Sequence, residues 1–176
     1  SMTTPRSLLC WLALSPLAAL VASPVELPNP GFEQKLEGWR NSADNGMSQP
    51  VAEAAAEGKL GLRVTDKDPA DGSRITSPRF EARPGATYRL TFKARSHGGR
   101  GMGVYLRFYD KVDRVIESPS GHKFHVEIPE TQKDWAPFEL KAVAPADAAK
   151  VELVIRSNNV AITSADLDAF ALSEEP

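Results

Sequence analysis

One short run of alternating residues carries the side chains best suited to binding a ligand. Tyr105, Arg107 and Tyr109 alternate with apolar residues, so on a β-strand they share one outward face. An aromatic surface can hold the apolar face of a sugar ring while a few polar groups fix its hydroxyls. His125 and Glu127 are expected to extend this surface if their strand belongs to the same sheet. These five residues are the predicted carbohydrate-binding site.

Two other interpretations of these residues stay open. Aromatic and basic residues are also ordinary on exposed sheet faces that bind nothing. A rival binding site is expected in the loops, with Trp39, Trp135 and the pair Asn158-Asn159 as candidates. A zinc site at His122 and His125 is not favoured, because strand alternation places these two histidines on opposite faces.

Catalytic chemistry finds little support in the sequence. A glycoside hydrolase needs two carboxylates facing each other about 5–9.5 Å apart. Glu127 with Asp110 is such a pair in principle, but no spacing selects it. The chain contains no Gly-x-Ser-x-Gly motif, and its single cysteine, Cys10, lies in the N-terminal segment discussed below. We expect no enzymatic activity, with a polysaccharide hydrolase or lyase as the less favoured alternative.

The elements that must position these residues are predicted to be β-strands. Apolar residues recur at every second position along most of the chain, and no segment has a convincing helical period. The expected inward rows are Leu60, Leu62 and Val64; Tyr88, Leu90, Phe92 and Ala94; Val104, Leu106 and Phe108; Phe124, Val126 and Ile128; Phe138, Leu140 and Ala142; Val151, Leu153 and Ile155; and Asp168, Phe170 and Leu172. Residues 49–56 are also expected to form a strand, despite their alanines. Many short strands separated by turns indicate an antiparallel β-sandwich or barrel.

The N-terminal segment is expected to be an export signal rather than part of the fold. Arg6 precedes an apolar run that ends in small residues near Ala22, which is typical of a signal peptide. The run is too short for a membrane span, which needs about 20 apolar residues. We therefore predict a signal peptide at residues 1–22, a single domain at residues 23–176 and a secreted or periplasmic location. Ser1 before Met2 is interpreted as an expression scar.

The charge of the chain excludes one class of partner. The sequence has 21 basic and 23 acidic residues, a net charge of −2. A nucleic-acid surface is not expected from this balance. Removal of the N-terminal segment would also remove Cys10, so stability is expected to come from burial or a bound metal rather than from a disulfide.

Several motifs, taken in order, resemble those of a known family. Asn29-Pro30-Gly31-Phe32-Glu33 is followed by Gly38-Trp39, and the strand-like segments 58–64 and 83–95 come next. Phe108-Tyr109-Asp110, Trp135 and the terminal segment 168–172 continue the likeness. Together they resemble the galactose-binding-like jelly rolls of bacterial carbohydrate-binding modules. The resemblance implies a jelly-roll fold over nearly all of residues 23–176, with Trp135 in a structural role; Trp39 is likewise expected in the core.

The resemblance also implies a structural calcium ion. In such modules calcium is commonly held by the glutamate after the opening phenylalanine, by an aspartate of the C-terminal segment and by backbone carbonyls. Glu33 and Asp168 stand at those positions. Calcium prefers several oxygen ligands, and an acid in the inward phase of Phe170 and Leu172 would need a partner. The sequence departs from the family pattern at Ala169, where a second aspartate is usual.

Two non-catalytic functions remain in competition at this stage. The favoured one is a secreted protein that binds poly- or oligosaccharide. The alternative is a structural or adaptor domain of the envelope that uses the same fold to meet a protein.

Overall fold

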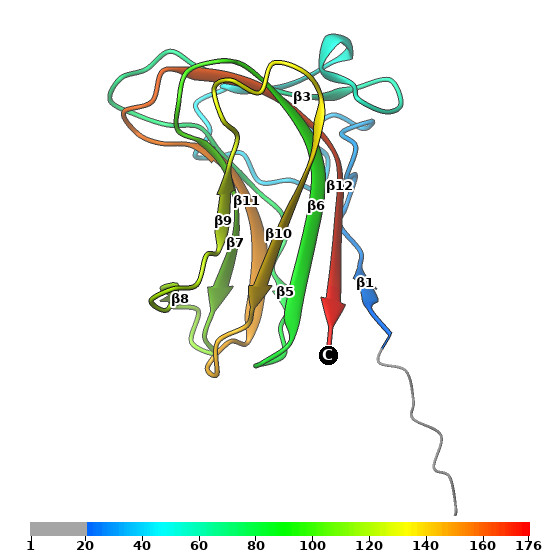
Figure 1. Cartoon of the computed structure of the whole chain (residues 1–176), viewed down its shortest axis with the longest axis vertical. Coiled ribbons are helices and arrows are strands. Elements are labelled where there is room, and N and C mark those ends of the chain that lie inside the picture. Colours follow the sequence, from blue (N-terminus) through cyan, green and yellow to red (C-terminus); the bar gives the residue numbers. More distant parts are fainter. Residues whose placement is uncertain (1–20) are drawn as a thin grey trace, which may run out of the picture.

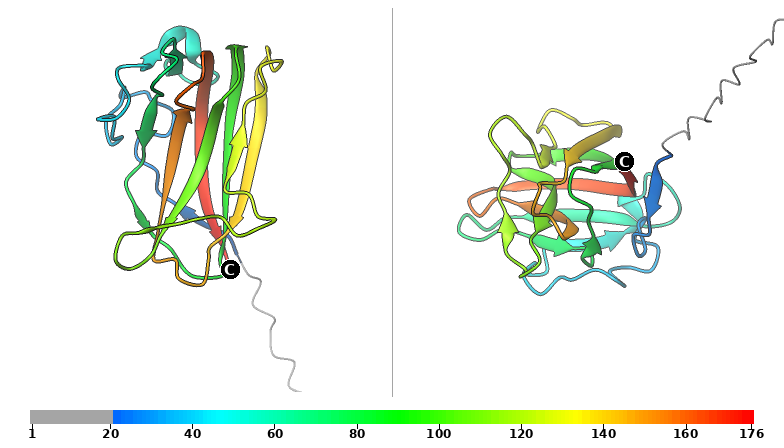
Figure 2. Two further views of the ribbon diagram at one scale, coloured as in Figure 1. Left: turned by 90° about the vertical axis from the view of Figure 1, so that its left-hand side faces the viewer. Right: turned by 90° about the horizontal axis from the view of Figure 1, so that it is seen from below.

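The computed structural model describes residues 21–176, which form two antiparallel β-sheets packed against each other (Figures 1 and 2). Sheet A has the order β10 (Ala136–Val143), β6 (Thr87–Gly98), β12 (Thr163–Glu175), β3 (Gly61–Asp66) and β2 (Ser48–Val51), and β1 (Ser23–Val25) pairs with β12. Sheet B has the order β4 (Arg74–Thr76), β11 (Lys150–Ser157), β7 (Met102–Tyr109) and β8 (Val115–Ile116), and β5 (Phe80–Glu81) and β9 (His125–Glu127) pair with β11 and β7. The predicted antiparallel β-sandwich is confirmed. Cys10 and all but the end of the predicted signal peptide lie outside the described residues.

The predicted alternation sets the two faces of each sheet. Along β6, every second side chain from Tyr88 to Ala94 is buried, while those between are half-exposed. The inward row of β11, Val151, Leu153 and Ile155, is fully buried. The apolar rows of the two sheets meet in a single core, where burial of a large apolar side chain contributes about 1.5–3 kcal/mol.

The segment after β2 differs from the prediction. The strand ends at Val51, and the 3₁₀ turn η1 (Ala52–Ala54) follows in place of a strand that continues to Ala56. Ala54 is buried against Gly61 of β3, where a Cβ atom would lie only 1.8 Å from the Ala54 carbonyl oxygen. The close packing on Gly61 ends the strand pairing and turns the chain over the edge of sheet A.

The opening motif closes one end of the core. Phe32 is fully buried, with its ring centroid 5.2 Å from that of Trp39 and 6.0 Å from that of Phe170 in an edge-on contact. The predicted core position of Trp39 is confirmed, since its side chain is 6% exposed. This aromatic cluster joins the N-terminal motif to β12, the strand that pairs with β6, β3 and β1.

A β-bulge interrupts β12 directly after Asp168, one of the two residues that were predicted to hold a metal. Asp168 lies opposite Lys93, whereas Ala171 lies opposite Thr91, so β12 has one extra residue at this point. Ala169 takes the left-handed conformation, with φ +55°.

Among the described residues, no helix is both long and apolar enough to cross a membrane.

Candidate functional site

The outward face of sheet B brings most of the predicted binding residues together. Tyr105 lies opposite Val154 of β11 on one side and opposite His125 of β9 on the other. Arg107 lies opposite Glu152 in the next outward row along β7. The conditional prediction that the strand of His125 belongs to the same sheet is thus confirmed.

Tyr105 and His125 form an aromatic pair on this face. Their ring centroids are 5.1 Å apart and their planes differ by 19°, so the rings are stacked. The Tyr105 ring leans over Gly103, where a Cβ atom would come within 3.0 Å of a ring carbon. Tyr105 is half-buried and His125 is exposed. Because residue 103 is a glycine, the tilted Tyr105 ring can occupy the space that a larger side chain would fill.

Tyr109 shares the outward direction of Tyr105 but is covered. Its side chain is 4% exposed, and the guanidinium carbon of Arg79 lies 3.7 Å from the centre of its ring. Its hydroxyl donates a hydrogen bond to Glu152 Oε1. Burial, and then this hydrogen bond, raise the pKa of the Tyr109 hydroxyl. Tyr109 thus holds Glu152 in place and presents no free ring face to a ligand.

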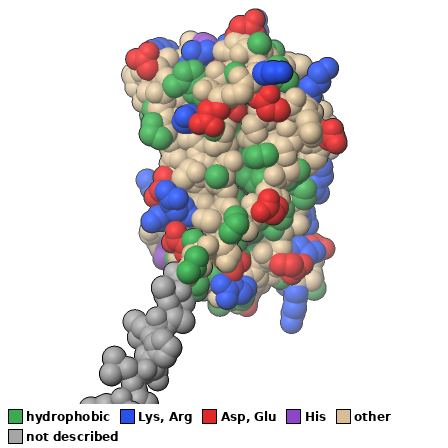
Figure 3. Space-filling model, turned by 90° about the vertical axis from the view of Figure 1, so that its right-hand side faces the viewer, with side chains coloured by type: hydrophobic (Ala, Val, Ile, Leu, Met, Phe, Trp, Pro, Cys, Tyr) green, Lys and Arg blue, Asp and Glu red, His purple; other side chains and the backbone are tan. Residues whose placement is uncertain are grey.

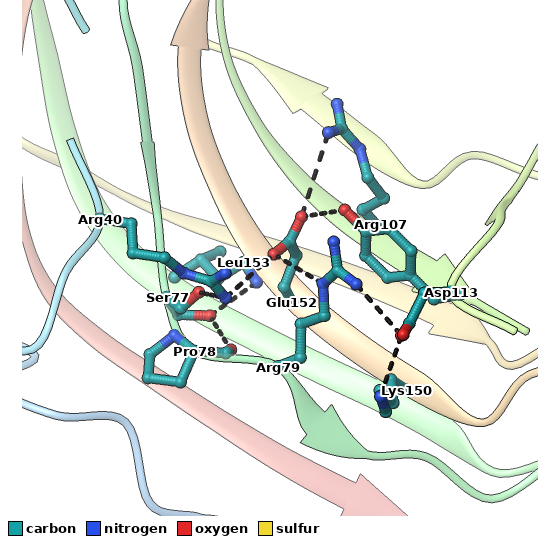
Figure 4. A network of polar contacts seen from close by, with 10 residues as sticks. Arg40, Ser77, Pro78, Arg79, Arg107, Asp113, Lys150, Glu152 and Leu153 are labelled. Carbon is teal, nitrogen blue, oxygen red and sulfur yellow. Dashed lines mark hydrogen bonds and ion pairs between the residues drawn. The ribbon is translucent and has the colours of Figure 1, made fainter. Parts of the chain in front are cut away.

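Glu152 is the centre of a polar network that Figure 4 shows from close by. Its side chain is 4% exposed, and three guanidinium groups surround it. Nη2 of Arg40 and Nε of Arg79 lie 3.6 Å from Glu152 Oε2, and Nη1 of Arg107 lies 4.0 Å from Oε1. All three are ion pairs longer than a normal hydrogen bond.

Two hollows open on this face and share Arg107. One has a volume of about 460 Å³ and is lined by Tyr105, His125, Phe124 and the segment 115–118. The other has a volume of about 300 Å³ and is lined by Tyr109, Glu152 and four arginines: Arg40, Arg74, Arg79 and Arg107. Both volumes lie within or near the usual range for small-molecule sites, about 300–1,000 Å³.

Glu127 stands apart from these two hollows. It is exposed and lies opposite Gly103, one outward row beyond His125. It lines a third hollow of about 540 Å³, together with His125 and charged residues of β10. The structure therefore places Glu127 on the flank of the Tyr105 surface, opposite the glycine over which the Tyr105 ring leans.

Sequence reasoning missed the polar half of this face. Glu152 and Arg156 belong to the outward row of β11, which also contains Lys150 and Val154, and the alternation of that strand was a signal that could have identified them. Arg40 and Arg79 come from segments outside any long strand. No local pattern indicates that they lie beside Tyr109.

The rival loop site is not assembled in one place. Trp39 is buried in the core, while Trp135 is half-buried with the Arg95 guanidinium carbon 4.8 Å from its ring centroid. Asn158 and Asn159 lie in the turn after β11, where Asn159 accepts a hydrogen bond from Arg156. Trp39 presents no exposed ring, so Trp135 is the loop candidate that remains.

Glu33 and Asp168, the two predicted calcium ligands, both lie near Gly31, but the strand phase of Asp168 differs from the prediction. A Cβ atom on Gly31 would lie 3.6 Å from Asp168 Oδ1 and 3.9 Å from Glu33 Cγ, so Gly31 lies beside both side chains. Asp168 does not share the inward phase of Phe170, because the bulge at Ala169 places it opposite Lys93, in the outward row of sheet A. It is nevertheless 0% exposed. The predicted inward direction of Asp168 is therefore wrong, although its predicted burial is confirmed.

Backbone N–H groups cover both carboxylates. Asp168 Oδ2 accepts hydrogen bonds from the N–H groups of Ala56 and Glu57, and Glu33 Oε1 accepts from those of Lys59 and Leu60. Burial, with a smaller contribution from the charge of Glu33, raises the pKa of Asp168. Within residues 21–176, no group of three or more His, Cys, Asp or Glu side chains forms a metal site.

Comparisons with known proteins bear on the fold. No protein-family model and no curated protein matches the chain. The solved structure of a family 16 carbohydrate-binding module matches 82% of this chain and 96% of that one, with 16% identity and a TM-score of 0.58. TmCBM61 in complex with β-1,4-galactotriose matches 83% of this chain and 95% of that one, with 20% identity and a TM-score of 0.56. The chain has the jelly-roll fold of carbohydrate-binding modules.

The same fold also occurs within a larger catalytic protein. The enzymatically active domain of tailspike protein 4 of bacteriophage CBA120 matches 82% of this chain but only 20% of its own, with 12% identity and a TM-score of 0.63. At these identities the likeness concerns the fold alone. The predicted carbohydrate-binding-module fold is confirmed, and its ligand must be argued from the residues of this chain.

Proposed function

We propose that this chain is an exported, non-catalytic protein that binds oligo- or polysaccharide on the outward face of sheet B. The observation that carries the proposal is the stacked pair of Tyr105 and His125 at the border of an open hollow. A partly exposed aromatic pair offers apolar contact to a sugar ring. Arg107, in the adjoining row of the same strand, supplies donors for ring hydroxyls.

Calcium between Glu33 and Asp168 forms the second part of the proposal. The residues fit a hard cation, because a fully buried carboxylate whose pKa is raised lies near a second carboxylate. Glu33 Oε2 accepts no hydrogen bond within the described chain, and so remains available as a ligand. Two side chains do not complete a calcium site, so backbone oxygens and water must supply the remaining ligands. A bound ion would tie the N-terminal motif to β12.

The non-catalytic part rests on the state of the candidate acids. Asp110 accepts hydrogen bonds from the backbone N–H groups of Val112 and Arg114 and from the Arg114 side chain. The Arg114 N–H contributes most to holding the pKa of Asp110 below its ordinary value. A general acid of a glycosidase needs the opposite shift. Asp110 therefore does not fit the role of the general acid. Glu127 lies opposite Gly103 near one end of β7, while Asp110 follows the other end, roughly 20 Å away along the strand, which is too far for a catalytic pair.

A glycan panel tests the proposal. Purified protein is passed over immobilised neutral and acidic polysaccharides, in calcium and in chelator, and bound protein and released reducing sugar are both measured. We expect retention on at least one glycan without release of sugar. Absence of retention on every glycan in calcium, together with recovery of one stoichiometric protein partner from envelope extracts, would favour the adaptor function. Release of sugar that Glu127→Gln abolishes would show an enzyme.

The location is tested on the natural source. We expect protein recovered from the periplasm or medium to begin close to Ser23, as the proposed signal cleavage requires. Mass spectrometry of its N-terminus decides this. Intact residues 1–22 on cytoplasmic protein would contradict export.

A further inference from the structure

The outward face of sheet B carries more positive charge than its own acids neutralise. Four arginines and one acid, Glu152, line the hollow beside Tyr109. Tyr109 already donates a hydrogen bond to that acid, and the three arginines nearest to it stay 3.6–4.0 Å away. Arg79 donates to Asp113 at 3.2 Å, and Arg40 donates to the Ser77 carbonyl oxygen at 3.1 Å. Among the described residues, the arginines of this hollow without a close acceptor are therefore Arg74 and Arg107, whose donors are left for a ligand.

Arg74 is the clearest case. Its side chain makes no hydrogen bond or ion pair with any residue in the part of the chain described, although it lines the hollow. It lies directly opposite Arg156 on the neighbouring strand. Like charges opposite each other on adjacent strands destabilise a sheet. Burial, and then the charges of Arg156 and Arg107, lower the pKa of the Arg74 guanidinium, which reflects the same repulsion.

The outward face of sheet A provides an internal comparison, because its arginines lie in close contact with acids. Asp166 lies within 2.8–2.9 Å of Arg63, Arg95 and His97. Arg89 pairs with Glu139 at 2.6 Å, and Lys93 with Glu57 at 2.7 Å. From the side on which β1 and β12 lie, acidic and basic side chains are interspersed over the surface (Figure 3). Each of these arginines and Lys93 has a carboxylate oxygen within 3 Å, whereas Arg74 and Arg107 on sheet B have none.

The aromatic pair lies between the basic groups. Tyr105 occupies the outward row between that of Arg74 and Arg156 and that of Arg107 and Glu152. Successive outward rows are about 7 Å apart along a strand. A sugar on Tyr105 thus has guanidinium groups within reach on both sides along the strand. Guanidinium binds carboxylate and sulfate oxygens through paired hydrogen bonds, which a neutral hydroxyl cannot match.

We propose that the glycan bound on sheet B is anionic, and that Arg74 and Arg107 bind its carboxylate or sulfate groups. This inference rests on the proposed function and names the ligand class of the same site. Uronic-acid polymers and sulfated galactans share the required chemistry. A neutral galactan or xylan leaves the repulsion between Arg74 and Arg156 uncompensated.

Calorimetric titration with defined glycans tests the inference. The probes are alginate and polygalacturonate oligomers for carboxylate, carrageenan oligomers for sulfate, and uncharged galactan and xylan oligomers. We expect an acidic glycan to bind more tightly than every neutral one, and its affinity to fall as salt rises. Arg74→Gln is expected to weaken this binding about tenfold or more, since a hydrogen-bonded charge pair is lost. Arg89→Gln, on the outward face of sheet A, is expected to change it less than about twofold.

Three outcomes would overturn the inference: the first leaves the proposed function standing, whereas the second and third overturn it as well. If a neutral glycan binds best and Arg74→Gln leaves it unchanged, sugar binding stands but the ligand is not anionic. If single-stranded DNA of the same charge binds as tightly as the acidic glycans, the face attracts any polyanion and has no sugar site. If no probe binds to a folded protein in calcium, both proposals fail. Preference among the acidic glycans identifies whether carboxylate or sulfate is the natural group.

Discussion

At the scale of single residues, two buried acids on β12, Asp166 and Asp168, differ in the groups that donate hydrogen bonds to them. Asp166 is surrounded by two arginines and a histidine, whereas Asp168 accepts its hydrogen bonds from backbone N–H groups. Burial opposes ionisation in both. In Asp166 the hydrogen bonds from Arg63, His97 and Arg95 outweigh burial and hold the pKa below its usual value, whereas in Asp168 burial prevails and raises the pKa.

Removal of Asp166 should therefore destabilise the protein substantially. We expect Asp166→Ala to lower the free energy of unfolding by about 2–4 kcal/mol, because Arg63 and Arg95 lose a shared, fully buried partner. Glu139→Ala removes the exposed partner of Arg89 and should cost at most about 1 kcal/mol. Urea unfolding of both variants measures the difference. Equal losses would show that the Asp166 cluster stabilises no more than a surface pair.

Calcium should stabilise the protein in a manner that depends on pH through Asp168. An acid whose folded-state pKa is raised binds its proton more tightly when folded, so without calcium it costs stability as pH rises from about 4. Calcium requires the ionised carboxylate, so the gain in melting temperature on adding calcium should be larger at pH 7.5 than at pH 4.5. Calcium at a hundred times its Kd contributes about 2.7 kcal/mol.

Thermal scans in calcium and in chelator measure this gain. Asp168→Ala should abolish it, while Glu57→Ala, which removes an exposed neighbouring carboxylate, should retain it. Identical melting temperatures with and without calcium at pH 7.5 would show that calcium does not stabilise the folded protein.

Only part of the face around Tyr105 could be predicted from the sequence. The shared face of Tyr105 and His125 followed from alternation, once their strands proved to be neighbours. The packing of the Arg79 guanidinium on the Tyr109 ring could not be predicted, because Arg79 lies 30 positions earlier in the chain, in the short segment between β4 and β5. Which segment lies over which strand depends on long-range register, and local patterns do not contain it.

At the scale of elements, β12 shows where alternation succeeds and where it fails. The inward direction of Phe170 and Leu172 was predicted, because apolar period two marks a buried row. The bulge before Phe170 was not predicted, because the residue that takes the left-handed conformation there is an alanine, Ala169. A glycine or asparagine at position 169 would have signalled the bulge, as these residues occupy that conformation readily.

The left-handed alanine in the β12 bulge leads to a prediction about stability. The left-handed conformation costs an L-residue about 1–2 kcal/mol, and asparagine tolerates it better than alanine does. We expect Ala169→Asn to raise the free energy of unfolding by about 0.5–1 kcal/mol. Ala171→Asn, at an exposed and regularly paired position of the same strand, should be neutral or destabilising, because asparagine is disfavoured in strands. If Ala169→Asn is the less stable of the two variants, backbone strain at the bulge is not the controlling factor.

At the scale of the whole molecule, the two sheets have different outward faces on one shared core. Sheet A presents matched charge pairs, and sheet B presents an aromatic pair, two hollows and unmatched arginines. The sequence predicted the sandwich because its strands are short, amphipathic and separated by turns. It did not predict the difference between the faces, which arises when β4, β7, β9 and β11 meet the segments that carry Arg40 and Arg79.

The outward face of sheet B, as the place where carbohydrate binds, is tested most directly by comparing two aromatic variants. The Kd of the glycan that the wild-type protein binds best is measured for Tyr105→Ala and for Trp135→Ala, after both are shown to melt near the wild-type temperature. Loss of an aromatic contact with the sugar should weaken binding by Tyr105→Ala about tenfold or more, and Trp135→Ala should bind as the wild type does. Unchanged binding by Tyr105→Ala, with binding lost in Trp135→Ala, would place the site in the loops and contradict the account.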